Sequence, residues 1–171
     1  MKIKIFTILL SFAALFIIPP AFAQDLSVSC SGSGCTPSTS TALFESTEKW
    51  YPGKSITKVI RITNSNTASQ DVATKTQNSS ATGTVDSVIT MSIRRVSTNA
   101  IVWSGSLQNF YAAGDIALAT FASGAIDDFA YTVALNQSAS NSFQSLETAF
   151  DLLLGFVTAD VTPTPTPTPT S

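Results

Sequence analysis

Few side chains in this sequence could carry out catalysis. Histidine is absent from all 171 residues, which excludes a Ser-His-Asp triad, a Cys-His pair and any histidine-ligated metal. The two cysteines are too few for a thiolate metal cluster. A pair of acids, as in aspartic proteases or glycosidases, remains possible for these residue types. We therefore expect a protein that is not an enzyme and that needs no cofactor.

The two cysteines, Cys30 and Cys35, enclose the short segment Ser-Gly-Ser-Gly. In an oxidising compartment this spacing favours a local disulfide. Because the closed loop is short, we expect the disulfide to contribute only modestly to stability. A redox-active pair is the alternative interpretation, but the spacing is not CxxC and no basic residue lies nearby in the sequence to activate a thiolate.

Two further groups could bind a ligand. Asp127 and Asp128 could offer oxygens to calcium, but they lack the DxDxDG spacing and are also typical of a solvated turn. Neighbours on a strand point to opposite faces, so these acids would act jointly only in a loop. Trp50, Tyr51 and Trp103 could stack against a sugar, although aromatic residues at strand ends more often cover a core. We assign no metal or cofactor site to these residues.

The first residues predict export from the cytoplasm. Lys2 and Lys4 precede an uncharged apolar run at 5–18, and Ala21-Phe22-Ala23 has the small–x–small form that signal peptidases accept. The run is shorter than the roughly 20 residues that span a bilayer. We therefore predict a signal peptide over 1–23, a secreted or cell-surface protein, and no membrane span after cleavage. An uncleaved N-terminal anchor is the alternative.

Composition divides the rest of the chain into three parts. Residues 24–41, rich in serine and glycine around the cysteines, are expected to form a flexible leader, and residues 42–160 a single domain. Residues 161–171 contain Thr-Pro units, which cannot join a sheet or helix and predict either an extended stalk or a tail without a role. Removing Lys2 and Lys4 from the 9 basic residues leaves 7 against 11 acidic ones, a net charge of −4 that argues against a nucleic-acid partner.

Alternating apolar residues predict a β-rich domain. Strand patterns occur at 43–45, 56–63, 85–96, 99–103, 116–121, 129–135 and 146–152. The polar segment 72–77 is expected at a sheet edge. Residues 107–112 predict a helical turn capped by Ser106. Roughly seven or eight short strands without a long helix indicate an all-β, antiparallel β-sandwich with at most one or two short helical turns.

Short motifs frame this domain in a fixed order. Trp50-Tyr51-Pro52-Gly53 has the residues of a β-turn and precedes a strand that ends at Asn64. Gly105-Ser106-Leu107 lies mid-domain, and Asn141-Ser142-Phe143-Gln144 offers amide groups that satisfy a tight turn before the last strand. In this order, over residues 43–157, the motifs resemble the TasA/camelysin family of secreted bacterial matrix proteins.

The resemblance implies a jelly-roll-like sandwich, an extracellular location, and assembly into matrix or biofilm fibres by strand donation. Some members are described as metallo-endopeptidases, but this sequence has no histidine to hold zinc. We therefore expect a structural subunit that self-associates through sheet edges, with Trp50, Tyr51, Pro52, Gly53, Asn141 and Gln144 as assembly or turn residues. The alternatives are a secreted adhesin-like module for a glycan or protein partner and, with less support, a camelysin-like peptidase.

Overall fold

The computed structural model describes residues 23–157, except for 33, 46–47 and 144. Apart from Ala23, the signal peptide predicted over 1–23 lies outside the described residues, as does the Thr-Pro segment at 161–171. The described residues form nine strands, two short α-helices and one 3-10 turn.

These elements follow one another closely along the chain. In order they are β1 (Leu26–Ser31), β2 (Gly34–Pro37), β3 (Ser55–Asn64), β4 (Gln70–Ala81), α1 (Val85–Val88), β5 (Ile89–Arg95), β6 (Ile101–Ser106), α2 (Leu107–Ala112), β7 (Ile116–Phe121), β8 (Ile126–Leu135), η1 (Asn141–Phe143) and β9 (Thr148–Phe156).

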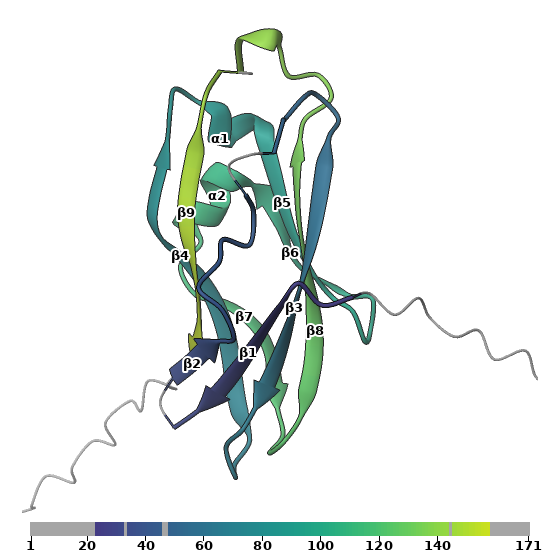
Figure 1. Cartoon of the computed structure of the whole chain (residues 1–171), viewed down its shortest axis with the longest axis vertical. Coiled ribbons are helices and arrows are strands. Elements are labelled where there is room, and N and C mark those ends of the chain that lie inside the picture. Colours follow the sequence, from purple (N-terminus) through teal and green to yellow (C-terminus); the bar gives the residue numbers. More distant parts are fainter. Residues whose placement is uncertain (1–22, 33, 46–47, 144, 158–171) are drawn as a thin grey trace, which may run out of the picture.

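Two sheets face each other across the core (Figure 1). One has six strands in the order β2-β1-β3-β8-β5-β6, and the other has three in the order β7-β4-β9. Every pairing is antiparallel except that of β1 with β3, which is parallel. The chain crosses repeatedly from one sheet to the other, as in jelly-roll-like sandwiches. The predicted all-β, antiparallel sandwich is confirmed.

The core lies between the inner faces of the two sheets. On β3 and β8 the period of two places Ile60, Ile62, Phe129 and Tyr131 inside, all with no exposed surface. From the smaller sheet, Val72 on β4 packs against the same core. Burial of each side chain of this size contributes about 1.5–3 kcal/mol. The apolar residues between the two sheets therefore supply most of the driving force for folding.

The two helices fill one end of the space between the sheets (Figure 1). Helix α2 begins where the sequence predicts it, with the Asn109 backbone N–H donating to Ser106 Oγ at 3.1 Å. Helix α1 occupies the start of the strand expected at 85–96. The buried residues Val85 and Ile89 are spaced for one face of a helix as well as for one face of a strand, so the pattern did not distinguish the two.

The flexible leader expected at 24–41 is wrong for its central part, because Leu26–Ser31 and Gly34–Pro37 form β1 and β2. In β1 the apolar residues alternate with serines, and the inward-facing Val28 and Cys30 are buried. The many serines and glycines around them hid this period in the sequence. The domain therefore begins near Asp25 rather than at residue 42.

Two other strand predictions are also wrong. The segment at 43–45 forms no strand, although Leu43 and Phe44 pack against the core. The segment at 72–77 lies in β4, the central strand of the smaller sheet, and not at an edge. Its polar side chains face solvent on the outer side of the sheet. Its inner side buries Val72 and Thr74, and the Thr74 hydroxyl donates to the Leu153 carbonyl oxygen at 3.0 Å.

Tyr131 brings a polar atom into the centre of the core. Burial raises the pKa of its hydroxyl far above the ordinary value, and the nearby Thr74 hydroxyl opposes part of that rise. Within the described residues, however, the Tyr131 hydroxyl has no hydrogen-bond partner of normal geometry. A buried hydroxyl without a partner costs free energy, so this group is not what stabilises the ring in its position.

We predict opposite results for removing these two hydroxyls. Tyr131→Phe should leave the free energy of unfolding unchanged or raise it by up to about 1 kcal/mol, because no normal hydrogen bond is lost. Thr74→Val should lower it by about 1–2 kcal/mol, because it leaves the Leu153 carbonyl without its donor. Urea denaturation of both variants measures the difference. A larger loss for Tyr131→Phe than for Thr74→Val would contradict this account.

Candidate functional site: the β1–β2 sheet edge and its anchor

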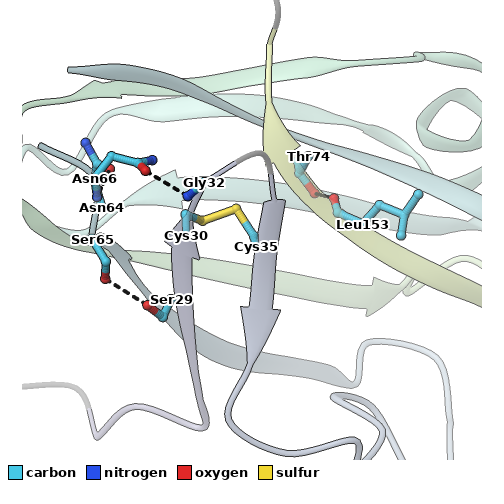
Figure 2. The surroundings of a disulfide bond; sticks show 9 residues. All are labelled: Ser29, Cys30, Gly32, Cys35, Asn64, Ser65, Asn66, Thr74 and Leu153. Atoms are coloured by element: carbon cyan, nitrogen blue, oxygen red, sulfur yellow. Dashed lines mark hydrogen bonds between the residues drawn. A yellow bond between two sulfur atoms is a disulfide. The ribbon is translucent and has the colours of Figure 1, made fainter. Parts of the chain in front are cut away.

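The β1–β2 hairpin forms one edge of the six-stranded sheet. Cys30 and Cys35 stand directly opposite each other in its antiparallel register and are joined by a disulfide (Figure 2). The Cys30 side chain is fully buried, whereas Cys35 is half-buried. The disulfide therefore ties the short outer strand β2 to the core beneath β1.

Strand β1 is attached to β3 at both of its ends. At the far end, the Ser65 backbone N–H donates to the Cys30 carbonyl oxygen at 2.8 Å. At the near end, the Asp25 N–H donates to the Val59 carbonyl oxygen at 2.8 Å, and the Asp25 carboxylate accepts the Val59 N–H at 2.8 Å. Lys58 Nζ lies 3.1 Å from the same carboxylate. The parallel pairing between these ends is thus held without help from β2.

The side chain of Asn64 is the anchor of this region, and it is completely buried. Its amide nitrogen donates to the carbonyl oxygens of Ala68 at 2.9 Å, Phe121 at 3.1 Å and Ala122 at 3.0 Å. Its amide oxygen accepts the Asn66 backbone N–H at 3.0 Å. Two amide hydrogens serve three acceptors, so at least one is shared. One side chain thereby joins the β3–β4 connection to the β7–β8 connection.

Asn66 extends this junction to the β1–β2 turn. The Gly32 backbone N–H donates to Asn66 Oδ1 at 2.8 Å, and the Ser29 and Ser65 hydroxyls lie 2.8 Å apart (Figure 2). The Ser123 hydroxyl donates to the Asn66 carbonyl oxygen at 2.8 Å. The turns at this end of the sandwich are therefore joined in one hydrogen-bonded network.

The Trp50-Tyr51-Pro52-Gly53 motif lies at the opposite end of β3, where that strand begins. The Lys54 N–H donates to the Tyr51 carbonyl oxygen at 3.0 Å, with Pro52 and Gly53 in the central positions and a Gly53 φ of 85°. This is the turn that the sequence predicts. The Gly53 N–H also donates to the carbonyl oxygen of Leu135 at 3.0 Å, which fixes the turn to the end of β8.

Lys54 holds the two aromatic residues of this turn. Its ammonium lies 5.7 Å from the Trp50 ring centre and 5.9 Å from that of Tyr51. It also lies 2.7 Å from the Glu48 carboxylate, and the hydrogen bond and charge of Lys54 lower the pKa of Glu48. Tyr51 nevertheless remains 58 % exposed. The turn therefore exposes the Tyr51 ring to solvent, while the Lys54 ammonium already occupies the cation–π position beside it.

Trp103 does not join Trp50 and Tyr51 in a shared platform. It comes from β6, and its ring centre lies 4.9 Å from that of Phe110 on α2. A Cβ atom at Gly105 would come within 3.0 Å of the Trp103 ring, so the glycine provides the space that the ring fills. Trp103 thus covers the core, in agreement with the simpler interpretation of its sequence position.

Asp127 and Asp128 each pair with a different arginine. Asp128 accepts two bonds from the Arg61 guanidinium, at 2.8 and 2.9 Å, and this raises the pKa of Arg61. Asp127 accepts from Arg95 at 2.5 Å and from the Ser97 hydroxyl at 2.9 Å. Adjacent strand residues point apart, so the two acids do not converge on one position.

The second turn motif is only partly described. Asn141 begins the 3-10 turn η1 between β8 and β9 and is exposed, whereas Gln144 lies outside the described residues. The structure therefore separates the predicted residues into two groups. Cys30 and Cys35 lie beside the end of β3, and the Trp50–Gly53 turn lies where β3 begins, about 30 Å away for a strand of this length.

Sequence reasoning did not identify Asn64 and Asp25 as structural anchors. Asn64 appeared there only as the residue at which a strand stops. The sequence does contain one signal for Asn64, because it directly follows the alternating positions of a strand. A polar residue at such a position is either exposed or, if buried, fully hydrogen-bonded. Asp25 had no signal, since its partner Val59 becomes its neighbour only after folding.

No protein-family model, no curated protein and no solved structure matches the chain. Within residues 23–157, as far as they are described, no three His, Cys, Asp or Glu side chains are grouped to hold a metal ion. No helix in the same part of the chain has the length and apolar character needed to cross a bilayer.

We predict that Asn64→Ala lowers the free energy of unfolding by about 2–4 kcal/mol, because buried carbonyl groups lose their donor. Asn64→Asp should cost a similar amount, since a carboxylate cannot donate. Asn109→Ala on the exposed face of α2 is the matched control and should change stability by less than about 0.5 kcal/mol. Equal effects of Asn64→Ala and Asn109→Ala in urea denaturation would rule out the anchor role.

A second prediction concerns the turn before β3. Gly53→Ala should lower the free energy of unfolding by about 1 kcal/mol, because its positive φ disfavours a side chain, while the added Cβ would meet only Gln137 at an ordinary contact distance of 3.7 Å. Gly34→Ala in β2 is the control, since a Cβ atom added to that glycine would meet no atom within 4 Å and its φ is not positive. Thermal unfolding of both variants should show a lower midpoint for Gly53→Ala alone.

Proposed function

We propose that this chain is a non-enzymatic, extracellular structural protein, a matrix or cell-surface subunit that self-associates through its sheet edges. The observation that carries the proposal is the character of three edge strands. Among the described residues, β6, β7 and β9 each pair with a strand on one side only. Together they contain no proline, no lysine or arginine, and a single charge, Asp151.

Such edges are unusual in proteins that remain monomeric. Edge strands present unpaired N–H and C=O groups, and soluble proteins blunt them with charge, proline or very short strands. β9 is nine residues long and contains three consecutive half-buried leucines. Its one acid, Asp151, accepts a hydrogen bond from Asn78 Nδ2 at 2.8 Å, so its carboxylate is partly satisfied within the sheet. These strands are therefore suited to pairing with another chain.

Two further observations support an extracellular role. The disulfide between Cys30 and Cys35 fits an oxidising compartment, because cytosolic thiols are kept reduced. The sequence begins with the features of a signal peptide. The resemblance to the TasA/camelysin family, drawn from short motifs, points in the same direction, towards a matrix or biofilm protein.

The second candidate is a secreted adhesin-like module that binds a glycan or a protein. Tyr51 supports it, because a ring that is 58 % exposed beside Trp50 could stack against a ligand. Trp103 instead covers the core beside Phe110, which removes the wider aromatic platform that would strengthen this candidate. Edge-mediated assembly therefore has the broader support.

We predict that residues 24–171, which contain all the described strands, self-associate in a concentration-dependent manner. Ala117→Lys should weaken this association, because Ala117 is exposed on the edge strand β7 and a lysine there opposes strand pairing. Thr90→Lys is the matched control, since Thr90 is exposed on β5, which pairs on both sides. Sedimentation velocity over a concentration series, with electron microscopy of the same samples, measures the outcome.

A wild-type monomer at every concentration would refute edge-mediated assembly and shift support to the adhesin-like module at Tyr51. Equal association of Ala117→Lys and Thr90→Lys would show that β7 is not an assembly edge. Weaker association of both variants would point to net charge as the cause.

A further inference from the structure

We propose that the Cys30–Cys35 disulfide controls access to a further assembly edge, the outer edge of β1, by holding β2 over it. This inference rests on the proposed function, since it concerns the regulation of the same edge-mediated association. In the oxidised protein β2 caps β1, and reduction of the disulfide uncovers β1 while the sandwich stays folded.

Besides its ladder with β1 and its position beside β9, strand β2 has only the disulfide to hold it in place. It has four residues, three of them exposed, and of the described strands it pairs only with β1. It ends at Pro37, which has no backbone N–H to donate. Its one partly buried side chain is that of Cys35, which enters the disulfide. A strand this short, with almost no buried apolar surface, is marginal without a covalent link.

Strand β1, in contrast, is held from its other side. It buries Val28 and Cys30 in the core and pairs with β3 along its length. The Asp25–Val59 bonds secure its beginning, and the Ser65–Cys30 bond secures its end. Apart from the Cys30 side chain, which is bonded to Cys35, none of these contacts involves β2. Loss of the disulfide should therefore release β2 and leave β1 in the sheet.

The edge that β2 covers is well suited to accept another strand. The Cys30 carbonyl oxygen faces β3, and the Ser27 carbonyl oxygen accepts the Ser38 N–H at 2.7 Å on the other side. By the alternation of a β-strand, the backbone groups of Ser27, Ser29 and Ser31 face β2. From Leu26 to Ser31 the strand carries no charge and no proline. Uncovered, it lacks the usual protection of an edge.

Strand β2 also lies beside β9, so the cap touches an edge of each sheet (Figure 1). β9 belongs to the smaller sheet and is one of its two edge strands. Release of β2 would therefore uncover the side of β1 and open the space next to β9 at the same time. The occupant that fits this edge is a strand of a second copy of the chain, because the copy offers the same charge-poor edges.

The opening step is a thiol–disulfide exchange with a dithiol reductant. One thiolate of the reductant attacks Sγ of the half-buried Cys35, the protein S–S bond breaks, and Cys30 leaves as a thiolate. The second thiolate of the reductant then displaces the Cys35 thiolate and closes a cyclic disulfide. The two protein thiolates take up protons, so the protein gains the two electrons that the reductant loses.

The test compares residues 24–171 in the oxidised form, after treatment with dithiothreitol, and as the variant C30A/C35A. Hydrogen exchange followed by mass spectrometry measures the amides of Ser27, Ser29 and Ser31, and sedimentation velocity measures association. In the reduced protein and in C30A/C35A, we expect exchange of these amides to accelerate by about tenfold or more. We also expect larger species than in the oxidised protein. Adding Ser29→Lys to C30A/C35A should reverse the association but not the faster exchange.

Each outcome has a distinct meaning. Unchanged exchange in β1 after reduction would overturn the inference, because β2 would then remain in place without the disulfide. Faster exchange with equal association in both redox states would also overturn it, and the proposed function would stand through the other edges. Absence of association in every form would refute the proposed function itself. Far-UV circular dichroism of C30A/C35A verifies that the sandwich stays folded, and reoxidation of the reduced wild type must restore the slow exchange.

Discussion

The buried amide of Asn64 is the interaction on which the arrangement of this end of the sandwich depends. An amide with no exposed surface is tolerated only if its polar atoms are hydrogen-bonded, and here three carbonyl groups and one N–H from separate connections meet it. β3 ends at Asn64, and Cys30 of β1 is in register with that residue. The hydrogen bonds of Asn64 therefore also fix where β1 pairs with β3. The position of the disulfide hairpin follows from that pairing.

A fold of two open sheets has edge strands, and in this protein the edges differ in how they are covered. The β1 edge is covered by a short strand that is held by a covalent bond. The segment that follows adds Leu43, Phe44 and Trp50 to the core without forming a strand in its described residues. In the part of the chain that the structure describes, no paired strand covers the second side of β6, β7 or β9. This difference is the physical basis for proposing that the edges are where the molecule meets other copies.

The residues with the capacity for chemistry are largely used within the fold. Asp127 and Asp128 neutralise arginines, Lys54 connects Glu48 with two aromatic rings, and the cysteines are joined to each other. The groups left for recognition are the backbone at strand edges and a few exposed apolar side chains, Tyr51, Ile101 and Ile126 among them. Recognition through backbone edges depends on shape and on the absence of charge more than on particular side chains.

Local signals were enough to predict the elements that depend on near neighbours. The alternating residues of β3 and β8, the Ser106 cap of α2 and the Pro52-Gly53 turn are of this kind and were predicted correctly, except that β8 begins at Ile126, before the expected residue 129. Folding in three dimensions was needed to decide which strands lie at edges, that β1 pairs in parallel with β3, and that Asn64 is buried. These features arise from partners distant in sequence, such as Phe121 for Asn64, and period and composition carry no information about distant partners.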